Sequence, residues 1–186
     1  TAERAPARAP QATPSRAPAT EADEPAAAAT TFGRHDPRDP VLQVEREALK
    51  LVLQQPALVG PVFDGVDAEA FSAEPYRLVH TAVVAAGGVG AGLVGEPWVR
   101  AVREASDDER VRNLVTELAV EPLRADDDAD VRYSQSIVAR LEEILATRRL
   151  AQLKSRLQRI NPVEQADEHN RLFGELVALE AYRRAL

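Results

Sequence analysis

The sequence predicts an all-α fold, in which a helical bundle is followed by a long helix and a C-terminal antiparallel helical hairpin. From residue 41 onward, apolar side chains recur at steps of three and four residues, as they do along one face of a helix. Prolines, glycines and acidic clusters separate these segments. No segment alternates apolar and polar residues between turn dipeptides, so we expect no sheet.

The first 40 residues have a different composition. Residues 1–40 form a tract of Ala, Pro, Thr and Arg, and Phe32 is its only large apolar side chain. Such a segment cannot bury enough apolar surface to offset the entropy lost on ordering. We therefore expect residues 1–40 to be a disordered linker that tethers the bundle to another domain upstream.

The bundle is predicted to cover residues 41–146. The helix predicted at 41–55 is apolar on most of its circumference in its second half, so it should be the central helix, ended by Pro56. Residues 56–71 contain prolines and glycines, which indicates short turns. Ser72 is predicted to cap the next helix, and the glycines of residues 87–95 then predict a flexible connector.

Two further helices and the start of the long helix follow. A helix is predicted at 96–105. Ser106 and Glu109 match a capping box, with Ser at the cap and Glu three residues later, which should open another helix. The acidic run at 126–130 suits the positive end of a helix dipole, so the long helix should run from there to about Asn161.

The apolar stripe of the long helix changes direction. The first half uses Ile137, Leu141 and Ile144, and the second half uses Ala146, Leu150, Leu153, Leu157 and Ile160. From Ile144 to Leu150 the helix turns by about 240° beyond one full turn. The first half should therefore pack on the bundle and the second half on another helix. Residues 147–149, at the changeover, could be either continuous helix or a hinge.

The last helix supplies the matching stripe. It is predicted to start at Pro162 and to present Leu172, Leu176, Leu179 and Leu186, with Phe173 and Tyr182 at the sides. Residues 147–186 should thus form an antiparallel hairpin. A pair of helices buries little surface by itself, so the hairpin should offer apolar positions to another protein.

Composition and motifs exclude several classes of chemistry. The chain has no Cys, which excludes disulfides and thiolate metal sites, and no Met, from which we expect a piece of a longer protein. His35, His80 and His169 are far apart, and the acidic run is better explained as a solvated helix cap than as a metal site. No apolar run approaches the roughly 18 residues that span a bilayer, and no signal peptide is present. We predict a cytoplasmic, non-catalytic chain without a cofactor.

A family resemblance rests on two stretches. "REALKLVLQQPALVGPVFDGVDAEAFSAEPYRLVHTAV", residues 46–83, resembles the start of the C-terminal, helicase-binding domain of the bacterial replicative DNA primase. "RRLAQLKSRLQRINPVEQADEHNRLFGELVALEAYRRAL", residues 148–186, resembles that domain's terminal hairpin. The resemblance covers about residues 41–186 and places residues 1–40 where the linker to the catalytic core would be.

The resemblance implies a function. The domain would dock on the hexameric replicative helicase and recruit primer synthesis to the replication fork. The zinc-binding and magnesium-dependent polymerase domains of the primase would lie upstream, outside this chain. The resemblance also implies a pocket for the acidic tail of single-stranded-DNA-binding protein, for which Arg77, Arg100 and Arg103 are the basic residues we predict.

The anchors predicted to contact the helicase lie on the last helix: Leu172, Phe173, Leu176, Leu179, Tyr182 and Arg183. Leu172, Leu176 and Leu179 are better explained as hairpin core, whereas exposed Phe173, Tyr182 and Arg183 fit interface hot spots better. Two alternatives stay open. The basic stretch 148–159 could bind nucleic acid directly, although the net charge of -7 argues against an extended phosphate contact. The chain could also be another helical adaptor, similar to the helicase N-terminal domain.

Overall fold

The computed structural model describes Phe32, Asp36 and residues 38–125 and 130–186, so most of the predicted linker lies outside the described residues. Its helices are α2 (Pro40–Gln54), α3 (Pro56–Val59), α4 (Glu74–Ala85), α5 (Gly95–Glu104), α6 (Glu109–Val120), α7 (Val131–Leu157) and α8 (Ala166–Ala185). Short 3-10 helices lie at η1 (Pro61–Gly65), η2 (Ala68–Ala70) and η3 (Val89–Ala91). None of the described residues is in a strand, and the predicted all-α fold is confirmed.

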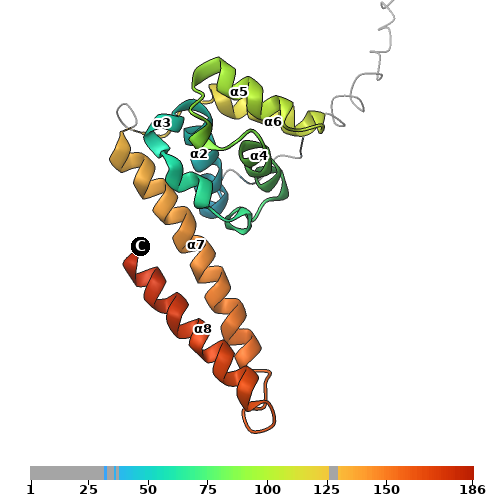
Figure 1. Ribbon diagram of the computed structural model, residues 1–186, viewed down its shortest axis with the longest axis vertical. Helices are drawn as coiled ribbons and strands as arrows, with labels where there is room; N and C mark the ends of the chain where they lie inside the picture. Colours follow the sequence, from blue (N-terminus) through green and yellow to red (C-terminus); the bar gives the residue numbers. More distant parts are fainter. Residues whose placement is uncertain (1–31, 33–35, 37, 126–129) are drawn as a thin grey trace, which may run out of the picture.

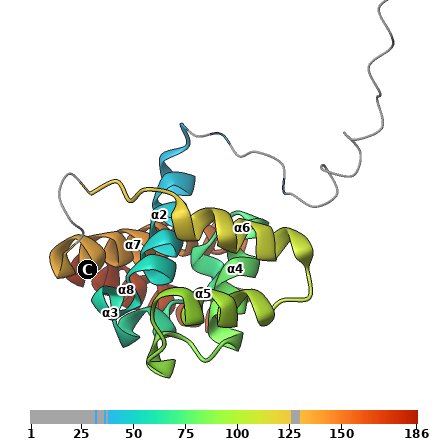
Figure 2. The ribbon, with the colours of Figure 1, turned by 90° about the horizontal axis from the view of Figure 1, so that it is seen from above.

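The molecule has a bundle and a projecting hairpin. Figure 1 shows α2 to α6 gathered around the first half of α7, and α8 returning beside the second half of α7. Seen from above, α2 stands at the centre of the bundle (Figure 2). It contacts α3, α4, α5, α6 and α7, which confirms the predicted central helix.

The core forms around α2 because its second half is buried on every side. Leu49, Leu51 and Val52 are all inaccessible to solvent. Trp98 on α5 is also fully buried, and its indole N–H donates to the Val52 carbonyl at 2.9 Å. A buried indole needs such an acceptor, so this bond fixes α5 against α2.

A buried carboxylate on α2, rather than Ser72, caps the N-terminus of α4. The Glu45 carboxylate accepts the Ser72 N–H at 2.8 Å and the Ala73 N–H at 3.3 Å. It also accepts the Ser72 hydroxyl at 2.5 Å. The predicted Ser72 cap is wrong, because that hydroxyl donates to Glu45 and the cap residue of α4 is Ala73, which has no side-chain acceptor.

A second buried group on α2 holds the segment between α6 and α7. The Lys50 ammonium lies 2.6 Å from the Glu47 carboxylate and donates to the Pro122 carbonyl at 2.6 Å. The other Glu47 oxygen accepts the Arg124 N–H and the Tyr133 hydroxyl, both at 2.7 Å. Because both charged side chains are almost fully buried, these bonds tie the chain around Pro122 and the start of α7 to the central helix.

The glycine-rich connector at 87–95 is held in place rather than free. The Asp64 carboxylate accepts the Val89 N–H at 2.7 Å and the Gly90 N–H at 2.8 Å. Gly88 has a φ of 67°, and a Cβ there would lie 2.4 Å from Asp64 Oδ1. The glycines therefore allow the backbone to approach a carboxylate closely.

The predicted capping box at Ser106 is also wrong. Asp108 is the cap of α6, and its carboxylate accepts the Arg110 N–H at 2.9 Å. Ser106 instead accepts the Asp108 N–H at 3.2 Å, which orients the cap from outside the helix.

The long helix begins as predicted but ends earlier. Asp130 caps α7 and accepts the Tyr133 N–H at 2.7 Å, while residues 126–129 of the acidic run lie outside the described residues. The helix ends at Leu157 instead of Asn161, and α8 begins at Ala166 instead of Pro162.

The predicted change of partners along α7 is present, with a different set of core residues. Ser134, Val138 and Leu141 are buried toward the bundle, and Ala146 and Leu150 are buried in the second half. Ile137 and Ile144, predicted as core, are only half-buried. They line a pocket between the first halves of α2 and α7, so part of each side chain stays open to solvent. The helix is continuous through residues 147–149.

Acid is expected to destabilise the bundle through His80. Its ring is buried beside Phe71 and Phe63, with centroids 5.1 and 5.6 Å away. Burial lowers the pKa of His80, and the Val66 backbone and the Asp67 and Asp64 carboxylates oppose this shift only in part. The unfolded chain therefore takes up the proton first, and the free energy of unfolding should fall as pH drops below about 6.5.

Urea denaturation at about pH 7.5 and about pH 5.5 checks this expectation. The carboxylates of Asp67 and Glu121 have lowered pKa values, because of the Glu69 backbone N–H and the Arg46 guanidinium respectively, and they titrate below this window. The same comparison in His80→Leu should show a smaller difference between the two pH values. An equal difference would assign the pH dependence to another group.

Candidate functional site

The hairpin of α7 and α8 is the one part of the described chain that projects from the bundle (Figure 1). Leu172 is fully buried between the two helices. The Tyr182 hydroxyl donates to Glu142 at 2.9 Å, and Arg156 pairs with Glu168 at 3.6 Å. These contacts confirm an antiparallel hairpin, because they join the two ends of α8 to the middle and the end of α7.

An apolar stripe on α8 faces away from α7. Phe173 and Val177 are 53% and 51% exposed and lie four residues apart, so they share one side of the helix. The His169 ring stacks on Phe173, with centroids 6.3 Å apart and an interplanar angle of 9°. We call His169, Phe173, Val177 and Ala181 the outer stripe. It offers an aromatic and an aliphatic side chain to a partner without opening the hairpin.

The structure separates the predicted anchor residues. Leu172 belongs to the hairpin core, and Leu176 and Leu179 are half-buried on the same side of α8. Phe173 and Arg183 are exposed. Tyr182 is half-exposed, but its hydroxyl is bound to Glu142, which raises its pKa. Of the six predicted anchors, Phe173 is the large apolar side chain that is free for a partner.

Two arginines at the changeover of α7 hold the hairpin against the bundle. Arg148 donates to the Glu69 carbonyl at 2.5 Å and to the Ala70 carbonyl at 2.9 Å. Arg149 binds the Asp67 carboxylate at 2.6 Å and the Glu69 carboxylate at 2.8 Å. We call these contacts the latch. They bind α7 to η2 at the point where α7 leaves the bundle.

In the latch, the positive charge of Arg149 lies against the negative charges of Asp67 and Glu69. The Glu69 backbone N–H and then the Arg149 guanidinium lower the pKa of Asp67. The Glu69 and Asp67 carboxylates raise the pKa of Arg149 above its already high value. The pair therefore stays charged throughout the physiological range. Because Arg149 is partly exposed, solvent screening keeps its contribution to stability small, and the latch acts chiefly on orientation.

Removing the latch should loosen the hairpin without unfolding the bundle. In Arg148→Ala/Arg149→Ala, α7 stays helical but loses the hydrogen bonds and ion pairs that join it to η2, so the hairpin is held less firmly against the bundle. We expect the free energy of unfolding to fall by about 1 kcal/mol. Because the chain has no cysteine, spin labels can be attached specifically at Thr116→Cys and Gln152→Cys. The distance distribution between them should broaden in the double variant, and an unchanged width would contradict the latch.

The basic stretch 148–159 is largely engaged within the molecule. Arg148 and Arg149 form the latch, Lys154 pairs with Glu180 at 3.1 Å and Arg156 pairs with Glu168. Arg159 donates to the Ser155 hydroxyl at 3.0 Å. These intramolecular partners favour a hairpin for protein docking over a surface that binds phosphates.

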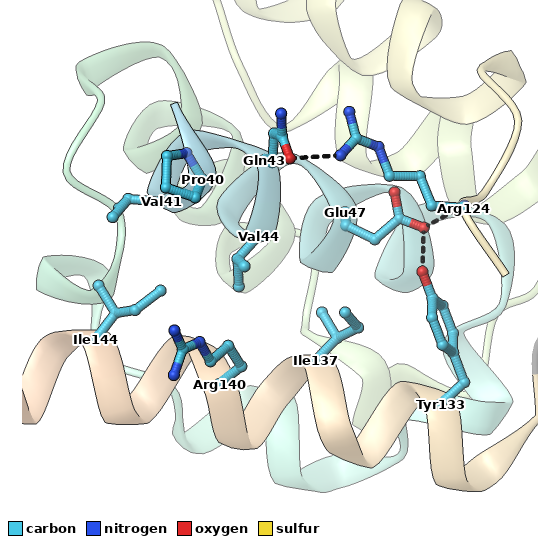
Figure 3. Close-up of a pocket in the computed structure, with 10 residues that line it drawn as sticks. All are labelled: Pro40, Val41, Gln43, Val44, Glu47, Arg124, Tyr133, Ile137, Arg140 and Ile144. Carbon is cyan, nitrogen blue, oxygen red and sulfur yellow. Dashed lines mark hydrogen bonds between the residues drawn. The ribbon is translucent and has the colours of Figure 1, made fainter. Parts of the chain in front are cut away.

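A pocket of about 320 Å³ lies between the first halves of α2 and α7 (Figure 3). Its apolar wall is formed by Val41, Val44, Ile137 and Ile144. Figure 3 shows the Tyr133 hydroxyl and the backbone of Arg124 meeting the Glu47 carboxylate at one end, while the Arg124 side chain reaches Gln43. The buried Glu47 carboxylate therefore closes the pocket at that end. Ile144 lies about 200° around α7 from Glu142, which binds Tyr182 of α8, so the pocket and α8 occupy opposite sides of that helix.

The three arginines predicted for an acidic tail are exposed on α4 and α5. Arg77 donates to the Ser72 carbonyl at 3.2 Å, and Arg100 pairs with Glu96 at 3.7 Å. An acidic-tail site at Arg77, Arg100 and Arg103 stays a prediction.

Sequence reasoning did not find two features of the site. Val177 was missed because it lies between the leucines of the α8 stripe and has no polar partner to mark it. Asp67 and Glu69 were missed because they are far from Arg148 and Arg149 in sequence. The signal for the latch was the pair of arginines at the change of direction in α7.

Within the part of the chain that the structure describes, no group of His, Asp and Glu residues could hold a metal ion. The prediction that this chain needs no cofactor stays a prediction. Over the same residues, none of the helices combines the length and apolarity needed to cross a membrane.

Comparison with known proteins identifies the family. The family described as "DNA primase DnaG DnaB-binding" matches residues 45–172, more than half of the chain. The match ends at Leu172, so Phe173 and Val177 lie just beyond it. The DNA primase of Mycolicibacterium smegmatis is 51% identical over 154 residues, which are 82% of this chain and 24% of the relative. The DNA primase of Streptomyces coelicolor is 38% identical over 144 residues, 73% of this chain and 22% of the relative.

A solved structure agrees with these matches. The helicase binding domain of primase from Mycobacterium tuberculosis has 47% identity and a TM-score of 0.63, covering 77% of this chain and 89% of that one. The chain spans about a quarter of the length of the curated relatives it matches. The shared sequence, the helical bundle and the hairpin together show that this chain belongs to the DnaB-binding domain family of DNA primase DnaG.

Proposed function

We propose that this chain docks a DNA primase on the hexameric replicative helicase and so brings primer synthesis to the replication fork. The observation that carries the proposal is the outer stripe of α8, an exposed apolar surface on a hairpin that projects from the bundle. Family membership and the name of the mycobacterial structure supply the identity of the partner. The docking role needs no catalytic group or cofactor in this chain. The proposed location of the protein is the cytoplasm.

The outer stripe suits a helix-in-groove contact. Phe173 and Val177 provide two apolar anchors one turn apart, which is the spacing that a groove between partner helices can accept. Hot spots of protein interfaces are commonly aromatic and lie at the centre of a desolvated patch. The latch serves this contact indirectly, because it sets the direction in which α8 is presented.

Calorimetric titration of the chain into the hexameric helicase tests the proposal. The matched variant ends after Arg149, which keeps the latch and the part of α7 that packs on the bundle. We expect the whole chain to bind and the truncated chain to lose binding while its circular dichroism still shows a folded bundle. Equal affinities of the two chains would refute docking through the hairpin.

Direct nucleic-acid binding is the alternative. It would give an affinity for single-stranded DNA that falls steeply with salt. The intramolecular ion pairs of residues 148–159 and the net charge of -7 both disfavour it. A titration with single-stranded DNA at low salt should therefore show no binding.

A further inference from the structure

Phe32 is the one large apolar side chain in the Ala/Pro-rich tract of residues 1–40. Composition assigned it to a linker, yet the structure packs it against the core of the bundle, where it is partly buried. The guanidinium carbon of Arg110, at the start of α6, lies 4.8 Å from the centroid of the Phe32 ring. A cation at this distance attracts the face of an aromatic ring.

The N-terminus of α6 holds Arg110 ready for this contact. The Asp108 carboxylate caps α6, and it also binds the Arg110 side chain through Nε at 3.1 Å and Nη2 at 2.7 Å. A two-point contact of this kind fixes the plane of a guanidinium group. Arg110 therefore presents an ordered cation to Phe32 at little further entropic cost.

Hydrogen bonds also fix Asp36, Arg38 and Asp39, just before α2. The Asp36 carboxylate accepts the Arg38 N–H at 2.9 Å, and the Asp36 carbonyl accepts the Asp39 N–H at 3.2 Å. The Asp39 carboxylate then caps α2 by accepting the Val41 N–H at 2.8 Å. The start of α2 is thus preceded by a defined turn.

We infer that Phe32 fastens the N-terminal tract to the start of α6, so that the polypeptide upstream leaves the bundle from α6 and not from the start of α2. This fastening goes beyond helicase docking and does not depend on it. Phe32 lies four residues before Asp36, where the held turn begins, so releasing Phe32 would lengthen the free tether by up to about 14 Å. The fastening would limit how far the upstream part of the protein can move from the bundle.

Limited proteolysis of the whole chain with trypsin tests the inference. Trypsin binds its substrate in an extended form on both sides of the cut, so cleavage after Arg34 requires Phe32 to leave α6. Cleavage after Arg16 gives an internal reference within the same tract. When opening is fast relative to cleavage, the rate follows the population of the released state.

Phe32→Ala should raise the rate of cleavage after Arg34, relative to that after Arg16, about tenfold, because most of the apolar contact is lost. Arg110→Gln should raise it about threefold, because Asp108 still caps α6 but the cation is gone. Phe32→Tyr, which keeps the ring, should cleave at nearly the original rate.

Two results would overturn the inference. One is an unchanged relative rate after Arg34 in Phe32→Ala. The other is an acceleration that is matched by cleavage inside the bundle, after Arg77 or Arg100, since Phe32 would then support the whole bundle instead of fastening the tract locally.

Discussion

A chain that carries Phe173→Ala and Val177→Ala together is expected to bind the hexameric replicative helicase about a hundredfold more weakly than the unchanged chain. Both side chains are about half-exposed, so they are available to fill a groove on the partner. Their loss removes an aromatic and an aliphatic anchor from one side of α8 while Leu172 still joins the two helices. Calorimetry or surface binding assays measure the affinity.

A matched control separates the outer stripe from exposed apolar surface in general. Val84 on α4 and Val120 at the end of α6 are 51% and 78% exposed. The pair Val84→Ala/Val120→Ala removes a comparable kind of surface from the bundle and should leave the affinity unchanged. Equal weakening by both pairs, or no weakening by the α8 pair, would contradict docking through the outer stripe.

Replacing Lys50 by methionine should destabilise the bundle by about 3–5 kcal/mol. The substitution keeps the aliphatic stem but leaves the Glu47 charge buried without its cation, and the Pro122 carbonyl loses its donor. Trp98 is the only tryptophan and is fully buried, so its fluorescence reports unfolding in urea. The midpoint of denaturation should fall accordingly.

A second variant shows whether the charge itself causes this loss. Glu47→Gln/Lys50→Met removes both charges and retains an oxygen that can accept from Arg124 and Tyr133. It should recover about 2 kcal/mol relative to Lys50→Met alone. If the double variant is as unstable as the single one, the loss comes from packing around Lys50 and the buried ion pair is not its cause.

The helices of this fold could be predicted from sequence because each one carries its own apolar periodicity, and a proline or glycine follows the end of α2, α4 and α6 within two residues. The caps at Ser72 and Ser106 could not. The acceptor at Ser72 comes from Glu45, which lies 27 residues away, and a local motif does not contain that information. The burial of Glu45, Glu47 and Lys50 on α2 could not be predicted for the same reason. Charged side chains on a helix are expected to face water unless a partner distant in sequence pairs with them.

The site was partly predictable. The change of direction at Thr147–Arg149 located the point where α7 leaves the bundle, because a stripe that rotates must face a new partner. The sequence left open whether this point was a hinge, and the answer depends on Asp67, the cap of η2, and on Glu69 within η2. Similarly, the stripe of Leu172, Leu176 and Leu179 indicated a hairpin, but only its geometry shows that Phe173 and Val177 lie on the outer side.

Methyl NMR of the complex tests the docking surface most directly. The chain would carry labelled valine and leucine methyl groups, and the hexameric helicase would be unlabelled. Docking through the outer stripe predicts that the Val177 methyl signals shift or broaden strongly, while those of Val84 and Val120 stay unchanged. The opposite pattern, with Val177 unaffected and the largest changes at Val62, Leu93 or Val94 on the bundle, would contradict the proposed docking surface.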